Sequence, residues 1–153
     1  MANTYTQIHI QVVFTVKNRE SFIRDKWKDE LYKYITGIIQ NHGHKLLQIN
    51  GTSDDIHILI GMRPTQSLSD LIKQVKQDSS LWINKKRLIK SKFSWQAGYG
   101  AFSYSRDAIP NVIRYIKNQE QHHKQTSFLE EYKKILNEFN VEYNEDYLFK
   151  PIE

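Results

Sequence analysis

The sequence predicts an α+β fold in which an antiparallel sheet carries helices on one face, and three observations support this prediction. Apolar and polar residues alternate at a period of two in some segments, which is typical of strands with one buried face. In other segments the apolar residues recur at helical spacing. The segments follow one another in the order β-α-β-β-α-β, which is the order of the split β-α-β, ferredoxin-like fold. Further helices follow this unit, and the first of them carries a candidate tyrosine.

The first half of this pattern is a strand, a helix and two further strands. Every even-numbered position from Ile8 to Val16 is apolar, whereas most residues between them are polar. The helix that follows ends at His42-Gly43, because glycine is common just beyond a helix end. The loop GTSDD separates the second and third strands. The expected ranges are 7–16 for the first strand, 24–41 for the helix, and 44–50 and 56–62 for the other two strands.

The second half begins with a helix that Ser67 caps, with Asp70 three residues later, close to the spacing of a capping box. A final strand, interrupted by glycines, is expected over residues 93–103. Asp107 is expected to cap a third helix, with Pro110 in its first turn, where the missing N–H does no harm. A short amphipathic helix over residues 128–139 ends the pattern.

Composition and charge limit the class of protein. With 153 residues and no linker-like segment, the chain is expected to form one domain over residues 1–153. It has no cysteine, no apolar run long enough to span a membrane and no signal-peptide pattern, so we expect a cytoplasmic protein. The formal net charge of +5 and the pI of about 9.3 favour an anionic partner such as nucleic acid.

A first candidate site lies in DDIHILIG, residues 54–61. Side chains at positions i and i+2 of a strand share a face, so Asp55 and His57 are expected to point together toward an open face of the sheet. Such a pair could form half of a divalent-metal site. The alternative is an ordinary hydrogen-bonded pair at a strand end. His9 lies on the non-core side of the first strand and is a further candidate to supply an imidazole to this site.

A second candidate site lies in IPNVIRYIKNQEQHHK, residues 109–124. Helical spacing assigns an apolar stripe to this segment and puts Tyr115 and Gln119 on the flank of that stripe. Gln119, one turn beyond Tyr115, could point its amide oxygen toward the tyrosine oxygen. The alternative is that Tyr115 is only a packing residue of an amphipathic helix.

Basic residues concentrate on the helix capped by Ser67 and just after it. They are candidates for contacts to nucleic-acid phosphates, although the same pattern is typical of a solvated helix face. The candidates are Lys73, Lys76, Lys85, Lys86 and Arg87.

Four segments, in their order and spacing, resemble the single-tyrosine HUH transposases of the IS-two-hundred-like insertion sequences. Relatives of that family are the REP-associated tyrosine transposases. The segments are GTSDDIHILIG, SLSDLIKQVKQDSSLWIN, WQAGYGAFSYS and VIRYIKNQEQHH. The resemblance implies a homodimer with a ferredoxin-like sheet that cleaves and rejoins single-stranded DNA beside hairpins. It also implies a covalent 5′-phosphotyrosine intermediate and dependence on Mg²⁺ or Mn²⁺.

The resemblance assigns a role to each candidate residue. Tyr115 matches the nucleophile, Gln119 matches the metal ligand on the tyrosine helix, and His57 matches the second histidine of the His-hydrophobic-His motif. The chain departs from the family at Asp55, where the first histidine is expected, and a carboxylate is also a good ligand for Mg²⁺ or Mn²⁺. In the family the tyrosine helix of one chain can serve the metal pair of the other, so active sites in trans are expected.

Two alternative functions stay open from the sequence. The first is a catalytically weakened or inactive relative that still binds hairpin DNA, and Asp55 is the residue that favours it. The second is a ferredoxin-like RNA-binding module that uses its sheet face. Against it, the expected glycine-aromatic motif is not where such a module needs it, and GYGAF at 98–102 is only a partial match.

Overall fold

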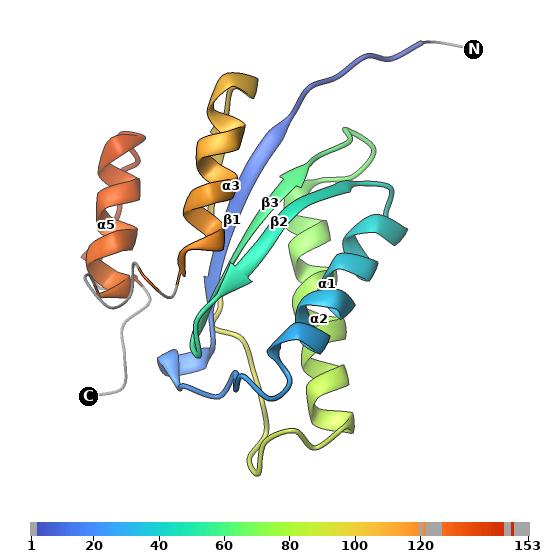
Figure 1. Cartoon of the computed structure of the whole chain (residues 1–153), viewed down its shortest axis with the longest axis vertical. Helices are drawn as coiled ribbons and strands as arrows, with labels where there is room; N and C mark the ends of the chain where they lie inside the picture. The colour runs from blue at the N-terminus through green and yellow to red at the C-terminus, as the bar shows by residue number, and fades with distance from the viewer. Residues whose placement is uncertain (1–2, 120, 122–126, 146–147, 149–153) are drawn as a thin grey trace.

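In the computed structural model, four strands pair antiparallel in the order β2-β3-β1-β4. Figure 1 shows β1, β2 and β3 at the centre of the molecule. The structure describes residues 3–119, 121, 127–145 and 148. The strands are β1 (His9–Thr15), β2 (Lys45–Gly51), β3 (Asp55–Gly61) and β4 (Gly100–Tyr104). The helices are α1 (Lys28–Asn41), α2 (Leu68–Lys85), α3 (Ile109–Lys117) and α5 (Phe128–Glu138). Within this described part, no helix is both long and apolar enough to cross a membrane.

The element order confirms the predicted β-α-β-β-α-β pattern. Strand β1 lies between β3 and β4, with Val13 opposite His57 and also opposite Gly100. The period-two pattern has the predicted consequence, because Val12 and Phe14 join the main core while Val13 packs on the opposite side of the sheet. The two central strands therefore supply apolar side chains to both faces.

Helices cover both faces of the sheet. Helices α1 and α2 lie on one side, as predicted, and α3 and α5 lie on the other (Figure 1). On this second side, α5 packs on Val13 and Phe102, and α3 packs on Leu59. The expectation that this sheet face is open is therefore wrong. The physical reason is that it carries apolar side chains of its own, which α3 and α5 remove from water.

Local details differ from the expectations at three places, the first being the start of α1, which lies at Lys28 and not at residue 24. The final strand begins only at Gly100, because the chain before it forms just an isolated bridge, between Trp95 and Val16, the residue after β1. Asp107 does not cap the tyrosine helix but lies in a short 3₁₀ helix, Arg106–Ala108, that leads into α3. The cap on α2 is confirmed, because Ser67 Oγ accepts a hydrogen bond from the Asp70 N–H at 3.1 Å.

Candidate active site and metal centre

A tight turn holds Asp55 at the start of β3. The Asp55 Oδ1 atom accepts hydrogen bonds from the N–H and from the hydroxyl of Thr52, each at 2.9 Å. The turn requires glycine at position 51, because a side chain there would collide with the backbone carbonyl of Asp55. Asp55 is completely buried. Its carboxylate is therefore fixed beneath α3 and α5 rather than exposed at a strand end.

His57 lies two residues further along β3, on the same face, and is also completely buried. Its Nδ1 atom is 3.0 Å from Nε2 of Gln11, whose Oε1 accepts a hydrogen bond from the Tyr104 hydroxyl at 2.7 Å. Its Nε2 atom is 3.2 Å from Oε1 of Glu131 on α5. Both ring nitrogens are thus held by neighbouring elements, which fixes the orientation of the ring.

The side chains of Asp55, His57 and Glu131 form a buried cluster with the donor set of a metal site. One ligand atom from each lies within 4.8 Å of the other two. Gln119 is also completely buried, and apart from its contact with Tyr115 its amide has no hydrogen-bond partner among the described residues. Carboxylate oxygens, an imidazole and an amide oxygen are ligands that Mg²⁺ and Mn²⁺ accept. The residues present therefore fit a divalent metal ion.

Tyr115 lies on α3 and faces this cluster. Its ring meets the His57 ring edge to face, with the ring centroids 6.1 Å apart. Asn50 of β2 fixes the end of the helix, because its Nδ2 atom donates to the carbonyl oxygens of Ile116 and Lys117, both at 3.0 Å. Helix α3 ends at Lys117, Asn118 forms a turn, and the backbone is helical again at Gln119.

The surroundings of the Tyr115 hydroxyl oppose its ionisation. Burial raises the pKa of Tyr115 far above its usual range, and the negative charge of Glu131 raises it further. A hydrogen bond with Glu131 and the charge of Asp55 act in the same direction, whereas a hydrogen bond with Gln119 lowers the pKa. A cation bound between the two carboxylates would remove much of this negative charge.

A cavity of about 280 Å³ leads to Tyr115 from the side of α5. Acidic side chains line it, so a phosphate would be repelled there unless a cation offset their charge. Lys134 is a basic residue at this cavity that the sequence analysis did not single out. The lining residues are Gln11, Tyr104, Tyr115, Glu131, Lys134, Ile135 and Glu138.

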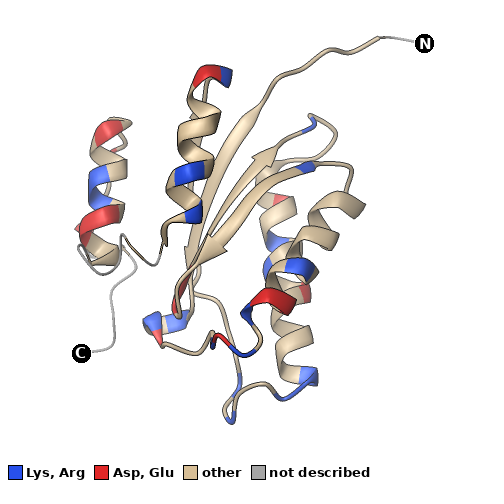
Figure 2. Cartoon of the chain, viewed as in Figure 1, with Lys and Arg blue, Asp and Glu red and all other residues tan. Residues whose placement is uncertain are grey.

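The basic candidates lie on the other side of the sheet, on and after α2 (Figure 2). Three of them are exposed: Lys73, Lys85 and Arg87. Lys86 is half exposed, and its Nζ atom is 3.9 Å from Oε2 of Glu30. Lys76 differs from them, because its ammonium group donates to the backbone carbonyls of two residues in the segment before β4. Burial lowers the pKa of Lys76 to about 8. We therefore assign Lys76 to the fold and keep the other four as surface charges.

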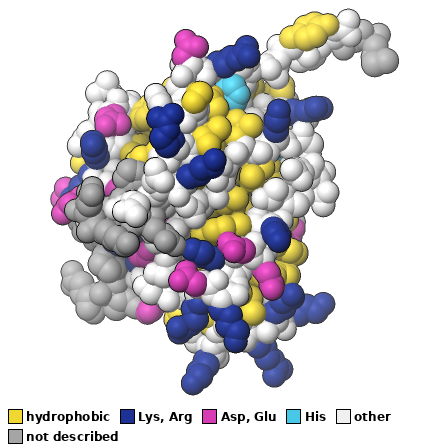
Figure 3. Space-filling view, viewed as in Figure 1, with side chains coloured by type: hydrophobic (Ala, Val, Ile, Leu, Met, Phe, Trp, Pro, Cys, Tyr) yellow, Lys and Arg dark blue, Asp and Glu magenta, His cyan; other side chains and the backbone are white. Residues whose placement is uncertain are grey.

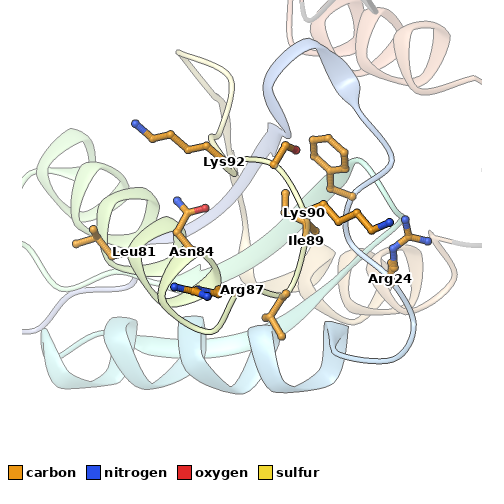
Figure 4. Close-up of a pocket in the computed structure, with 10 residues that line it drawn as sticks. Arg24, Leu81, Asn84, Arg87, Ile89, Lys90 and Lys92 are labelled. Atoms are coloured by element: carbon orange, nitrogen blue, oxygen red, sulfur yellow. The ribbon is translucent and has the colours of Figure 1, made fainter.

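A larger hollow of about 1260 Å³ opens at the C-terminal end of α2. Both apolar and basic residues line it, and the basic ones are Arg24, Arg87, Lys90 and Lys92. Figure 4 shows Arg24 and Lys90 close together on one side and Lys92 pointing the other way. Lys and Arg side chains also gather at the lower end of the face in Figure 3. This end of the molecule is a basic surface, remote from Tyr115.

The structure brings four predicted residues together and leaves one aside. Asp55, His57, Tyr115 and Gln119 converge as predicted. His9 pairs with Gly61 at the far end of β1, about 13 Å along the strand from the residue opposite His57, so it does not contribute.

The sequence analysis missed Glu131. The signal that could have found it is an acidic residue within the apolar stripe of the last helix. The other buried positions of that helix are Phe128, Tyr132, Ile135 and Leu136. A carboxylate at such a position is costly to bury without a partner.

Comparison with known proteins identifies the family. The family model described as "Transposase IS200 like" matches residues 4–119. A protein of Deinococcus radiodurans R1 described as a candidate transposase has a similar structure, with a TM-score of 0.62 and 21% identity over 78% of this chain and 96% of that chain. A REP-associated tyrosine transposase bound to a REP hairpin has a TM-score of 0.61 and 12% identity over 82% of this chain and 74% of that chain. No curated protein gives a significant match.

The two structural similarities have low identity and therefore show a shared fold. The family match carries more, because it covers most of the chain and includes both Asp55-Ile56-His57 and the Tyr115 helix. Residues after 119, and with them α5, lie outside it. The chain belongs to the IS200-like transposase family.

Proposed function

We propose that this transposase cleaves and rejoins single-stranded DNA next to hairpins through a covalent 5′-phosphotyrosine intermediate on Tyr115. The observation that supports this most is the position of Tyr115. Its hydroxyl lies beside a cluster with the donor set of a metal site, and a cavity leads to it from the surface. A tyrosine used only for packing has no need of such neighbours.

The reaction is a transesterification, so bond energy is conserved and no nucleotide cofactor is required. The Tyr115 oxygen attacks a backbone phosphorus, the phenolic proton is released, and the P–O3′ bond breaks. The departing O3′ takes a proton and becomes a 3′ hydroxyl, while the 5′ phosphate stays on Tyr115. A second 3′ hydroxyl then attacks this phosphorus, which joins the new strands and restores the tyrosine.

The proposed metal ligands are Asp55, His57 and Gln119, and the proposed ion is Mg²⁺ or Mn²⁺. When bound, such an ion supplies positive charge at the scissile phosphate and at the developing negative charge of the transition state. The protein holds the Asp55 carboxylate through Thr52 and the His57 ring through Gln11. Because Asp55 replaces the histidine of the family motif, we expect a preference for hard, oxygen-seeking ions.

The proposed DNA substrate has a hairpin end, and the hairpin-bound structural neighbour supports this choice. The exposed Lys73, Lys85, Lys86 and Arg87 are the proposed contacts to phosphates of the hairpin. Contacts of this type position a duplex but do not read its sequence. Since these residues and Tyr115 lie on opposite faces of the sheet, the single strand would have to pass around the edge of the molecule.

We also propose that the chain works as a homodimer, as the family resemblance implies. The resemblance further implies that the tyrosine helix serves the metal pair of the other chain. The contact between Tyr115 and His57 within one chain supports an arrangement in cis instead.

The two alternative functions differ in their support. An inactive, hairpin-binding relative remains the competing proposal, and only Asp55 favours it. An RNA-binding module would require an exposed sheet face, and α3 and α5 cover the face in question.

The test is an incubation of the protein with labelled single-stranded hairpin DNA and Mg²⁺ or Mn²⁺, followed by a denaturing gel. We expect a metal-dependent nick and a covalent protein–DNA band. Tyr115→Phe should abolish both and leave hairpin binding unchanged, because the ring still packs and only the hydroxyl is removed. Tyr34→Phe, which changes a partly exposed tyrosine on α1, is the matched control and should behave like the wild type.

Two results would contradict the proposal. A covalent band with Tyr115→Phe would show that another residue is the nucleophile. Absence of nicking by the wild type, with activity gained in Asp55→His, would favour the inactive relative.

A further inference from the structure

Glu131 is the residue of the cluster that neither the family motif nor the family match accounts for. It lies on α5, beyond residue 119, where the match ends. Only 7% of its side chain is exposed, and its Oε1 atom is 3.2 Å from Nε2 of His57. The neighbouring residues Phe128, Tyr132 and Ile135 pack α5 on the sheet, which fixes Glu131 at this position.

We propose that Glu131 is a further ligand of the divalent cation held by Asp55 and His57, so that α5 completes the metal site from within the same chain. This inference rests on the metal site of the proposed function. It adds a ligand that compensates in part for the histidine replaced by Asp55.

Charge is the first argument for this role. Asp55 and Glu131 are two carboxylates buried within 4.8 Å of the same imidazole, where water screens their mutual repulsion poorly. A divalent cation between them would balance the two negative charges of the carboxylates, and a neutral imidazole adds no charge. Two carboxylates with one imidazole also form a harder ligand set than two imidazoles, which suits Mg²⁺ and Mn²⁺.

The buried amide of Gln119 is a second and independent argument. Its oxygen and nitrogen atoms are shielded from water, and Tyr115 is their only partner among the residues that the structure describes. A buried amide oxygen with so few partners still has a lone pair that can bind a cation. Gln119 and Glu131 both contact Tyr115, so this amide oxygen lies in the same cluster as the Glu131 carboxylate.

Glu131 also connects the cation to the nucleophile, because it hydrogen-bonds with the Tyr115 hydroxyl. As a metal ligand, Glu131 would direct its oxygens to the cation and would release that hydroxyl. Tyr115 could then approach a phosphate only in the metal-loaded protein. The same carboxylate would thus restrain the nucleophile before the cation binds.

The experiment measures Mn²⁺ binding to the full chain without DNA, by the decrease of the electron paramagnetic resonance signal of free Mn²⁺. Glu131→Gln keeps the shape and removes the charge, and it should weaken Mn²⁺ binding at least about tenfold. Glu130→Gln, at the exposed neighbouring position of α5, is the matched control and should bind Mn²⁺ like the wild type.

Thermal unfolding with and without Mn²⁺ gives a second measurement, because an ion bound to the folded state raises Tm. We expect this increase in the wild type and Glu130→Gln, and a much smaller one in Glu131→Gln.

Equal Mn²⁺ affinity of Glu131→Gln and the wild type would overturn the inference. In that case a lower Tm of the variant without metal would identify Glu131 as only an ion-pair partner of His57. A wild type that binds no Mn²⁺ without DNA would also overturn it. Failure of the proposed function would look different. The wild type would then bind Mn²⁺ and Glu131→Gln would bind it more weakly, but the wild type would form no covalent DNA band.

Discussion

At the scale of single residues, the orientation of one amide would control the proposed metal binding by His57. Gln11 contacts Nδ1 of His57, and the Tyr104 hydroxyl contacts the other end of the same amide. For Nε2 to bind a metal, the ring proton must be on Nδ1, and an oxygen must accept it. A half-turn of the Gln11 amide presents that oxygen, and the Tyr104 oxygen can then accept from the amide nitrogen. In the proposed metal site, Gln11 would therefore be a positioning residue.

This role predicts opposite effects for two substitutions at position 11. Gln11→Leu removes the acceptor and should weaken Mn²⁺ binding by about tenfold. Gln11→Glu supplies a permanent acceptor and should bind Mn²⁺ at least as tightly as the wild type. Titration with Mn²⁺ in the absence of DNA measures both. Equal affinities of all three proteins would show that Gln11 serves only in packing.

The sequence was informative about residues whose position follows from a local period. A period of two was sufficient to put Asp55 and His57 on one face, and helical spacing was sufficient to separate Tyr115 from the apolar stripe of its helix. Glu131 could not be found in this way, because its approach to His57 depends on how α5 packs across the sheet. Lys76 shows the same limit, since its pattern is that of a surface lysine and only the fold reveals its carbonyl partners.

At the scale of elements, the tyrosine helix is held at one face and at its C-terminal end. One face packs on Leu59 of β3, and Asn50 of β2 binds the last carbonyl groups. Neither contact was apparent from the sequence, because both join α3 to strands that are distant along the chain. The element order and the sheet were predictable, whereas the covering of the second sheet face depends on packing between distant segments.

The hydrogen bonds of Asn50 predict a measurable contribution to stability. Asn50→Ala removes two hydrogen bonds and leaves two carbonyl groups without this donor, which should cost about 2 kcal/mol of unfolding free energy. Chemical denaturation measures this decrease. Asn137→Ala, at an exposed position of α5, is the control and should change stability little. A decrease below about 0.5 kcal/mol in Asn50→Ala would mean that the helix end does not depend on this cap.

At the scale of the whole molecule, α2 with its basic residues and the tyrosine helix α3 lie on opposite sides of the sheet (Figures 1 and 2). This separation predicts that DNA binding and DNA cleavage can be weakened independently. A substitution that removes one lysine or arginine from a DNA phosphate should reduce the slope of log affinity against log salt concentration by about 0.9 for duplex DNA.

We therefore expect Lys85→Gln and Arg87→Gln each to weaken hairpin binding and to reduce this slope by about one. Lys133→Gln, on α5 and paired with Glu145, is the control and should leave the slope unchanged. Fluorescence anisotropy with a labelled hairpin at several salt concentrations measures these values. Unchanged slopes in the α2-side variants would mean that the basic surface is only a solvated face.

The assembly of the active site gives the last prediction at this scale. Tyr115 and His57 of one chain are in ring contact, so a single chain holds both the proposed nucleophile and the proposed metal pair. Glu131 and Gln119 also reach the cluster from the same chain. If the sites are assembled in cis, a Tyr115→Phe chain and a His57→Ala chain each lack one half of their own site. Their mixture should then show no nicking of hairpin DNA above that of the separate variants, even after the chains have been unfolded and refolded together. Recovery of nicking in the mixture would mean that the tyrosine helix passes from one chain to the metal pair of the other, and that the dimer works in trans.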